Sequence, residues 1–170
     1  YVTDPVDGSI DFDQVRADAL RTKPKMMLCG YTSYPRDIDY ASFKAIADEV
    51  GAITMTDASH FGGLVAGRAM ANPFDFGFDI VTTTTHKSLR GPRGGMVLCR
   101  KPFAKALDKS VFPGLQGGPH MNAVAGIAVT LLKAQTQEFQ DYAQQVLVNA
   151  KTLANSLMAG GVSLVTGGTD

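Results

Sequence analysis

The apolar positions of the chain predict alternating helices and strands over roughly its first hundred residues. An apolar stripe runs through Phe12, Val15 and Leu20. Asp11 precedes this stripe, and Gln14 lies three residues after Asp11, as in a capping box. A short helix is therefore predicted here. The apolar run 25–29 then ends at Gly30, which is typical of a strand that is buried on both faces.

A second helical stripe follows a turn-rich loop around Pro35. Its apolar residues are Phe43, Ile46, Ala47 and Val50. Gly51 takes the position after the last turn, so the spacing predicts a helix from about 40 to 50. Three further strands are predicted over 52–56, 80–84 and 95–100. Strand, helix and strand in this order indicate an α/β fold built on a βαβ unit and a mostly parallel sheet.

The pattern changes after residue 121, where helical stripes replace strands. One stripe runs through Val124, Ile127, Ala128 and Leu131. A longer one extends from Phe139 to Leu157 and is followed by two glycines, which predicts a long connecting helix. The run 162–165 after it is predicted to be the first strand of another domain. We therefore expect a division into 1–136, the second half of a larger domain, and 137–170, the connecting helix and the start of a smaller one.

The composition restricts the classes of partner. The chain has 170 residues, of which 45% are hydrophobic, and its 16 Lys and Arg balance its 16 Asp and Glu. A net charge of zero disfavours a protein that binds nucleic acid or an anionic membrane. The longest apolar runs, such as 26–29 and 96–99, are far shorter than the roughly 20 residues of a membrane span. The chain opens at Tyr1 and ends on a turn-like string, so we expect both ends to be cuts within a longer protein.

The two cysteines, Cys29 and Cys99, lie in separate apolar runs, without CxxC spacing or a histidine cluster. We therefore expect reduced, mostly buried thiols of a cytoplasmic protein and no metal site.

Polar clusters follow three of the predicted strands. These clusters cover 31–34, 57–60 and 82–87. In a parallel sheet, ligands bind beyond the carboxyl ends of the strands, where the loops converge. We therefore expect a carboxylate (Asp57), a histidine, several hydroxyls and a lysine (Lys87) to face one crevice.

Each of these residues also has an ordinary structural interpretation. An aspartate after a strand usually caps a turn, a lysine is usually a surface charge, and a histidine usually packs in a hydrogen-bonded setting. Their coincidence favours a cofactor that has a pyridine nitrogen, an aldehyde and a phosphate. Such a cofactor needs an acid to keep the ring nitrogen protonated and an amine to form a Schiff base. Asp57 and Lys87 can fill these two roles.

Two glycine-rich loops follow the lysine, over 91–95 and 113–119. Each can expose backbone N–H groups to an anion, or can be an ordinary tight turn. Neither matches GxxxxGK[ST] or a GxGxxG at a strand–helix junction, so ATP and dinucleotides are disfavoured.

The string TTTTHKSLRGPRGG (82–95) carries a resemblance to a known family, together with DASHFGGLVAGR (57–68), YPRDIDYASFKAIADEVGA (34–52) and FPGLQGGP (112–119). The chain closely resembles serine hydroxymethyltransferases over nearly its whole length. The resemblance implies a three-layer sandwich with a mostly parallel sheet, the aspartate-aminotransferase-like large domain that binds pyridoxal 5′-phosphate (PLP), present here in part. It also implies interconversion of serine and glycine, with transfer of the hydroxymethyl one-carbon unit to tetrahydrofolate.

The resemblance carries over residue by residue. Lys87 matches the lysine that forms the Schiff base, and Asp57 matches the carboxylate that pairs with the pyridine nitrogen. His60 matches the histidine beside the ring, and His86 one that is tied to substrate specificity. Thr32 stands where the family usually has a serine, and a hydroxyl remains.

Gly118 matches a glycine whose N–H reaches the cofactor phosphate of a neighbouring subunit. The resemblance thus implies a homodimer or a dimer of dimers with shared active sites. Arg93 lies at a motif position close to the site, without an assigned role.

The sequence also departs from the family. DASH (57–60) replaces the usual DMAH, and 67–79 differs from the family's usual proline-rich stretch. The resemblance implies that other cofactor and folate contacts lie upstream of this chain and that the arginine for the substrate carboxylate lies downstream. Two alternatives stay open: another PLP-dependent lyase or aldolase of this fold, such as a threonine aldolase, and a catalytically inactive fragment.

Overall fold

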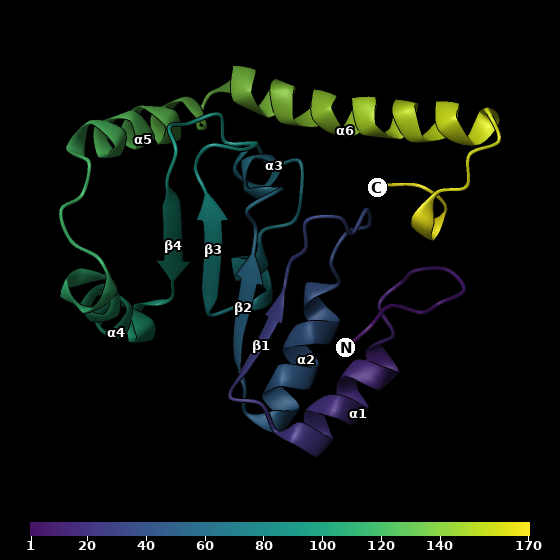
Figure 1. Cartoon of the computed structure of the whole chain (residues 1–170), viewed down its shortest axis with the longest axis horizontal. Helices are drawn as coiled ribbons and strands as arrows, with labels where there is room; N and C mark the ends of the chain where they lie inside the picture. Colours follow the sequence, from purple (N-terminus) through teal and green to yellow (C-terminus); the bar gives the residue numbers. More distant parts are fainter.

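The computed structural model describes all of residues 1–170, which form an α/β structure (Figure 1). The strands are β1 (Met26–Cys29), β2 (Ile53–Asp57), β3 (Ile80–Thr84) and β4 (Gly95–Cys99). The helices are α1 (Phe12–Thr22), α2 (Tyr40–Val50), α3 (Gly62–Ala66), α4 (Lys101–Lys109), α5 (Met121–Lys133) and α6 (Gln137–Ala159). Short helical turns are η1 (Pro73–Phe76), η2 (Ser110–Leu115) and η3 (Val165–Gly167).

The four strands form one sheet in the order β1-β2-β3-β4, which is also their order in the sequence. β1, β2 and β3 run parallel, and β4 runs antiparallel to β3. The predicted βαβ unit and the mostly parallel sheet are confirmed. Since the three parallel strands end at the same edge, the loops after them converge there (Figure 1).

Side-chain caps fix where the first two helices begin. Asp11 accepts a hydrogen bond from the backbone N–H of Gln14 at 3.0 Å, and Asp39 accepts one from the N–H of Ser42 at 3.0 Å. The expected capping box is only half formed, because the Gln14 side chain donates to Asp18 instead of turning back to the cap. The apolar stripe of α1 also differs from the expected one. Leu20 is exposed, and the buried residues of α1 are Val15 and Ala19.

The main core lies between β1 and the pair α1 and α2. Met27 and Cys29 point into it and are buried, whereas Met26 and Leu28 on the other face are 42% and 47% exposed. The prediction that this strand is buried on both faces is therefore wrong for this chain. β1 is an edge strand, and α1 and α2 cover only one of its faces. The chain thus supplies two layers of the sandwich here, the sheet and the helices on one side.

The burial of Cys29 leads to a testable prediction about its reactivity. Burial raises the pKa of the Cys29 thiol to about 11, and the side chain is 1% exposed. At pH 8 only about one thiol in a thousand is then ionised, so we expect almost no alkylation of Cys29 in the folded full-length protein.

The same shift has a consequence for stability. The thiol is protonated at neutral pH in both the folded and unfolded states, so the contribution of this group to stability is lost only as the pH rises from about 9 towards 11.

Peptide mapping after treatment with iodoacetamide measures the alkylation. Rapid labelling of Cys29 only after denaturation is the expected result, and labelling at the rate of a free thiol in the native protein would contradict it.

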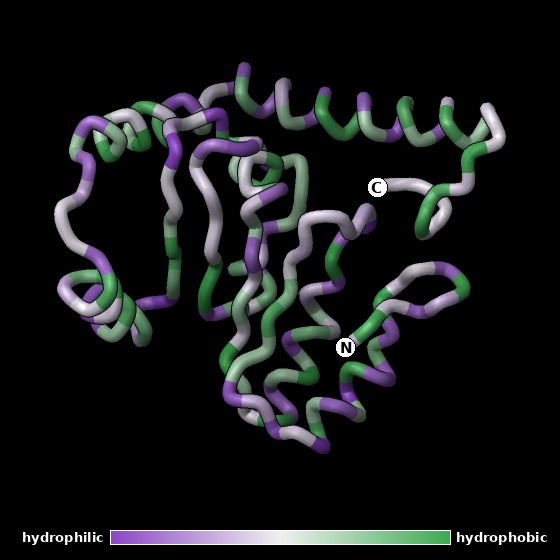
Figure 2. The backbone as a smooth tube through the Cα atoms, in the orientation of Figure 1, coloured by the Kyte–Doolittle hydropathy of each residue, from purple (hydrophilic) through white to green (hydrophobic).

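The long second helix of the C-terminal part is confirmed as α6. Thr136 caps it by accepting a hydrogen bond from the N–H of Phe139 at 3.3 Å. Hydrophobic and hydrophilic residues alternate along its length (Figure 2). Phe139 and Ala143 are buried near its start, where α6 contacts α3, whereas Leu153 is 61% exposed. The structure therefore anchors the first turns of α6 to the sheet domain and leaves much of the remaining apolar stripe uncovered.

The strand expected at 162–165 is wrong. This segment has no neighbouring strand, and the chain continues into the short turn η3, where Thr166 has a φ of 62°. The Arg36 side chain holds the turn by donating to the carbonyl oxygen of Thr166 at 2.6 Å and to the Asp170 carboxylate at 2.7 Å. The division of the chain at 136 and 137 stays a prediction. None of the helices combines the length and the apolar character that crossing a bilayer requires.

Candidate active site

The carboxyl end of β2 places Asp57 at the edge where the parallel strands end. Asp57 is the last residue of β2, and its Oδ1 accepts a hydrogen bond from the N–H of Ser59 at 2.9 Å. Gly30, directly after β1, packs against the backbone of Asp57, and a side chain at Gly30 would overlap those backbone atoms. The φ of Gly30 is 102°, in the region that favours glycine. This close approach fixes the backbone of Asp57 against the end of β1, and the hydrogen bond from Ser59 orients the carboxylate.

Lys87 and His60 are 27 residues apart in the sequence, and the fold brings them into contact. The Lys87 Nζ lies 3.2 Å from His60 Nε2. Ser88 braces this pair, because its hydroxyl donates to the carbonyl oxygen of His60 at 3.2 Å and accepts from the N–H of Gly63 at 2.9 Å. At this distance the imidazole is a hydrogen-bond partner of the Lys87 side-chain nitrogen. The two predicted residues therefore form an amine–imidazole pair.

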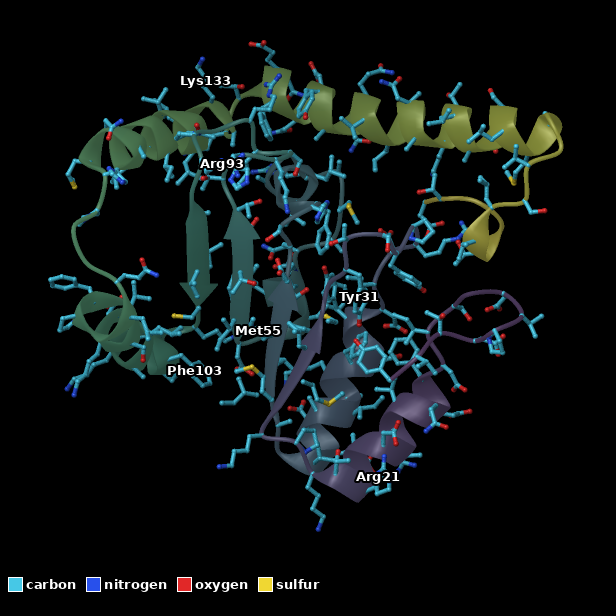
Figure 3. All side chains as sticks on the ribbon, viewed as in Figure 1. Arg21, Tyr31, Met55, Arg93, Phe103 and Lys133 are labelled. Carbon is cyan, nitrogen blue, oxygen red and sulfur yellow. The ribbon has the colours of Figure 1, made fainter.

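His86 precedes Lys87 in the chain but pairs with the 91–95 loop. Its Nε2 lies 3.1 Å from Arg93 Nη1, and its Nδ1 lies 3.4 Å from the N–H of Gly94. Both partners are N–H donors and a neutral imidazole has one acceptor nitrogen, so the tautomer of His86 decides which of the two contacts is a hydrogen bond. Arg93, which the sequence left without a role, thus orients His86. Arg93 lies beyond the ends of β3 and β4 and beneath α5 (Figure 3).

The remaining two predicted site residues differ in their placement. Thr32 lines a cavity of about 180 Å³ together with His60 and Arg36, so it shares a surface with the imidazole of the pair. Gly118 is exposed in the excursion between α4 and α5, with a φ of 55° and open space around its Cα. The segment between α4 and α5, which contains Gly118, lies on the outer side of β4, away from the ends of β1 and β2 (Figure 1).

The threonine hydroxyls of 82–87 were expected to face the crevice, and three of them do not. Thr83 Oγ1 and Thr84 Oγ1 donate to backbone oxygens of the loop after β2, at 3.3 and 3.1 Å. Thr85 Oγ1 donates to the carbonyl oxygen of Pro92 at 2.6 Å. These hydroxyls therefore bind the site loops to one another instead of being free for a ligand.

The glycine-rich loop 91–95 also makes contacts within the chain that hold it in place. The N–H of Gly91 donates to the carbonyl oxygen of Thr85 at 2.7 Å, so this donor is not available to an anion. A side chain at Gly91 would meet both that carbonyl and the Thr130 side chain of α5. The close packing requires glycine here and holds the loop between β3 and α5.

Comparison with known proteins agrees with this geometry. The sequence profile of the family described as serine hydroxymethyltransferase matches residues 1–170. A serine hydroxymethyltransferase of Desulfotalea psychrophila is 53% identical over 164 residues, which are 96% of this chain and 38% of that protein. One from Prochlorococcus marinus strain MIT 9312 is 52% identical over the same shares of both chains, and one from strain MIT 9515 is 50% identical over all of this chain and 40% of its own length. The chain thus spans about two fifths of the length of these relatives. The match over its full length shows that it belongs to the serine hydroxymethyltransferase family.

Proposed function

We propose that the protein containing this chain interconverts serine and glycine and passes the hydroxymethyl carbon of serine to tetrahydrofolate, with PLP as its cofactor. The observation that carries this proposal is the pairing of Lys87 with His60 at 3.2 Å, at the strand edge where Asp57 ends β2. The names of the relatives, which share about half of the residues of this chain, support the same activity.

The side chains at this edge fit the two reactive ends of PLP. A pyridine nitrogen needs an anionic acceptor that keeps it protonated; Ser59 orients the carboxylate of Asp57, and Gly30 packs against the backbone of Asp57. An aldehyde needs a primary amine, and Lys87 supplies one whose position the contact with His60 fixes. PLP, once bound, supplies the electron sink that cleavage of the Cα–Cβ bond of serine requires.

In this proposal each of the candidate site residues has a distinct role. Lys87 holds the aldehyde end, and His60 orients the Lys87 side chain through the contact of 3.2 Å between Nε2 and Nζ. Asp57 keeps the ring nitrogen protonated. His86, oriented by Arg93, is placed next to Lys87 to act on the substrate. Thr32 offers its hydroxyl from the cavity that it shares with His60.

We further propose that Gly118 acts in a neighbouring subunit, as part of a homodimer or a dimer of dimers with shared active sites. Its exposure and the open space around it support this assignment. We also propose a cytoplasmic location, which the two unpaired thiols, Cys29 and Cys99, support.

The substrate preference of the full-length protein tests the proposed activity. We expect tetrahydrofolate to accelerate the cleavage of serine by about tenfold or more, because the folate removes the one-carbon unit, while cleavage of threonine is unaffected by folate. Glycine formation from each amino acid, with and without tetrahydrofolate, is the measurement. Threonine cleavage that exceeds serine cleavage, with no effect of folate on either, would identify a threonine aldolase instead.

A further inference from the structure

The lysine loop, residues 87–90, contacts the long helix through Leu89, which is buried against Phe139, and through the side chain of Arg90. The guanidinium carbon of Arg90 lies 4.0 Å from the ring centroid of Tyr142 and 5.3 Å from that of Phe139, both on α6. The two rings are 5.5 Å apart and inclined at 57° to each other, so they present adjoining surfaces to the cation. A guanidinium over aromatic faces at these distances makes favourable cation–π contacts.

The backbone of Arg90 is tied to Lys87 itself. The N–H of Arg90 donates to the carbonyl oxygen of Lys87 at 2.9 Å and closes the turn that carries the reactive lysine. Arg90 adopts a φ of 61°, which is uncommon for a residue other than glycine. Surrounding contacts must stabilise this conformation, and the stacking of the side chain on α6 is such a contact.

The aromatic side of this contact is rigid. Phe139 is 2% exposed and belongs to a small core with Leu89 and Ala134, which are 4% and 6% exposed. The same turns of α6 pack closely on α3, where a side chain at Gly67 would overlap Ala143. The first turns of α6 therefore form a fixed platform beside the lysine loop.

We propose that Arg90 is a positioning residue for Lys87. Its guanidinium stacks on Phe139 and Tyr142 and its N–H closes the 87–90 turn, so the platform on α6 sets where the amine of Lys87 points. This proposal rests on the proposed function, in which Lys87 holds PLP. The charge and the planar shape of the side chain both contribute, and lysine cannot replace the stacked guanidinium.

Amide hydrogen exchange in the cofactor-free, full-length protein is the first test. In an Arg90→Lys variant we expect the amides of 88–91 to exchange about five- to tenfold faster, while those of α2 and β1 are unchanged. Tyr142→Leu removes the platform from the other side and should produce the same local change. Arg68→Lys is the matched control, because Arg68 also has a left-handed φ, 58°, but its N–H donates to Val65 and not to the lysine turn.

The second test uses the PLP-loaded protein. We expect Arg90→Lys to lower kcat about tenfold with little change in the KM for serine, and to lower the fraction of cofactor that borohydride fixes to Lys87. Wild-type exchange at 88–91 in both the Arg90 and Tyr142 variants would overturn the proposal, as would faster exchange there with wild-type kcat and borohydride fixation. If wild-type protein fixes no PLP at Lys87, the proposed function fails, and the exchange experiment still decides whether Arg90 holds the turn.

Discussion

Replacement of Lys87 by alanine in the full-length protein is expected to abolish the visible absorbance of bound PLP and at least about 99% of serine cleavage. The covalent step needs a primary amine, and no other lysine contacts His60. Positioned proton transfer by a side chain is typically worth about 100- to 10,000-fold, and the variant loses this contribution together with the amine. Absorbance spectra, borohydride reduction followed by peptide mapping, and the rate of glycine formation measure the effect.

Lys105→Ala is the matched control for this experiment. Lys105 lies on the exposed surface of α4, away from the loops at the carboxyl ends of the parallel strands. This variant should keep the spectrum and the rate of the wild type. Retention of the visible band by Lys87→Ala, with activity that resists borohydride, would refute the assignment of Lys87 and with it the proposed function.

Replacement of Gly30 by alanine is expected to destabilise the protein by about 3–5 kcal/mol and to abolish binding of PLP. Two costs add up here: a left-handed φ in a residue with a side chain, and overlap of the new methyl group with the backbone of Asp57. Relief of the overlap requires β2 to move away from the loop after β1, which displaces the carboxylate assigned to the ring nitrogen. Denaturant unfolding and titration with PLP measure the two effects.

Gly51→Ala separates these costs. Gly51 ends α2 with a φ of 71°, and a Cβ there meets no atom within 4 Å. Only the backbone term applies, so this variant should lose about 1–2 kcal/mol and still bind PLP. Equal losses of stability in the two variants would show that the contact between Gly30 and Asp57 does not position the site.

The sequence predicted the helices and strands that can be identified from the spacing of their own apolar residues, without knowledge of the elements that they pack against. The helices at 40–50 and 137–159 and the four strands follow from such spacing. The short helix α3 and the helix α4 were not predicted: α3 has only five residues and begins with two glycines, and α4 has nine residues with the short apolar stripe Phe103 and Leu107. The segment 162–165 shows the opposite error, because an apolar run becomes a strand only beside another strand.

The candidate site was predictable as a set of residues but not as a set of contacts. The ends of parallel strands meet, so Asp57, His60 and Lys87 were expected together. The hydrogen bonds that brace them involve Ser88 and Gly63, and the sequence does not show that these two residues contact each other. The threonine hydroxyls were expected to serve a ligand, but their partners are backbone carbonyls whose positions only the folded loops define.

The order of the strands in the sheet bears on how the protein folds during synthesis. Every strand pairs with the next one along the chain, so the longest closure within the sheet joins partners only about 27 residues apart, such as Cys29 and Thr56. Pairings between residues near in sequence form quickly, whereas pairings across a whole polypeptide form slowly. A nascent chain can therefore complete this sheet, together with α1 and α2, as soon as β4 leaves the ribosome, without waiting for later segments. The bare face at Met26 and Leu28 then offers a surface on which other parts of the protein can assemble.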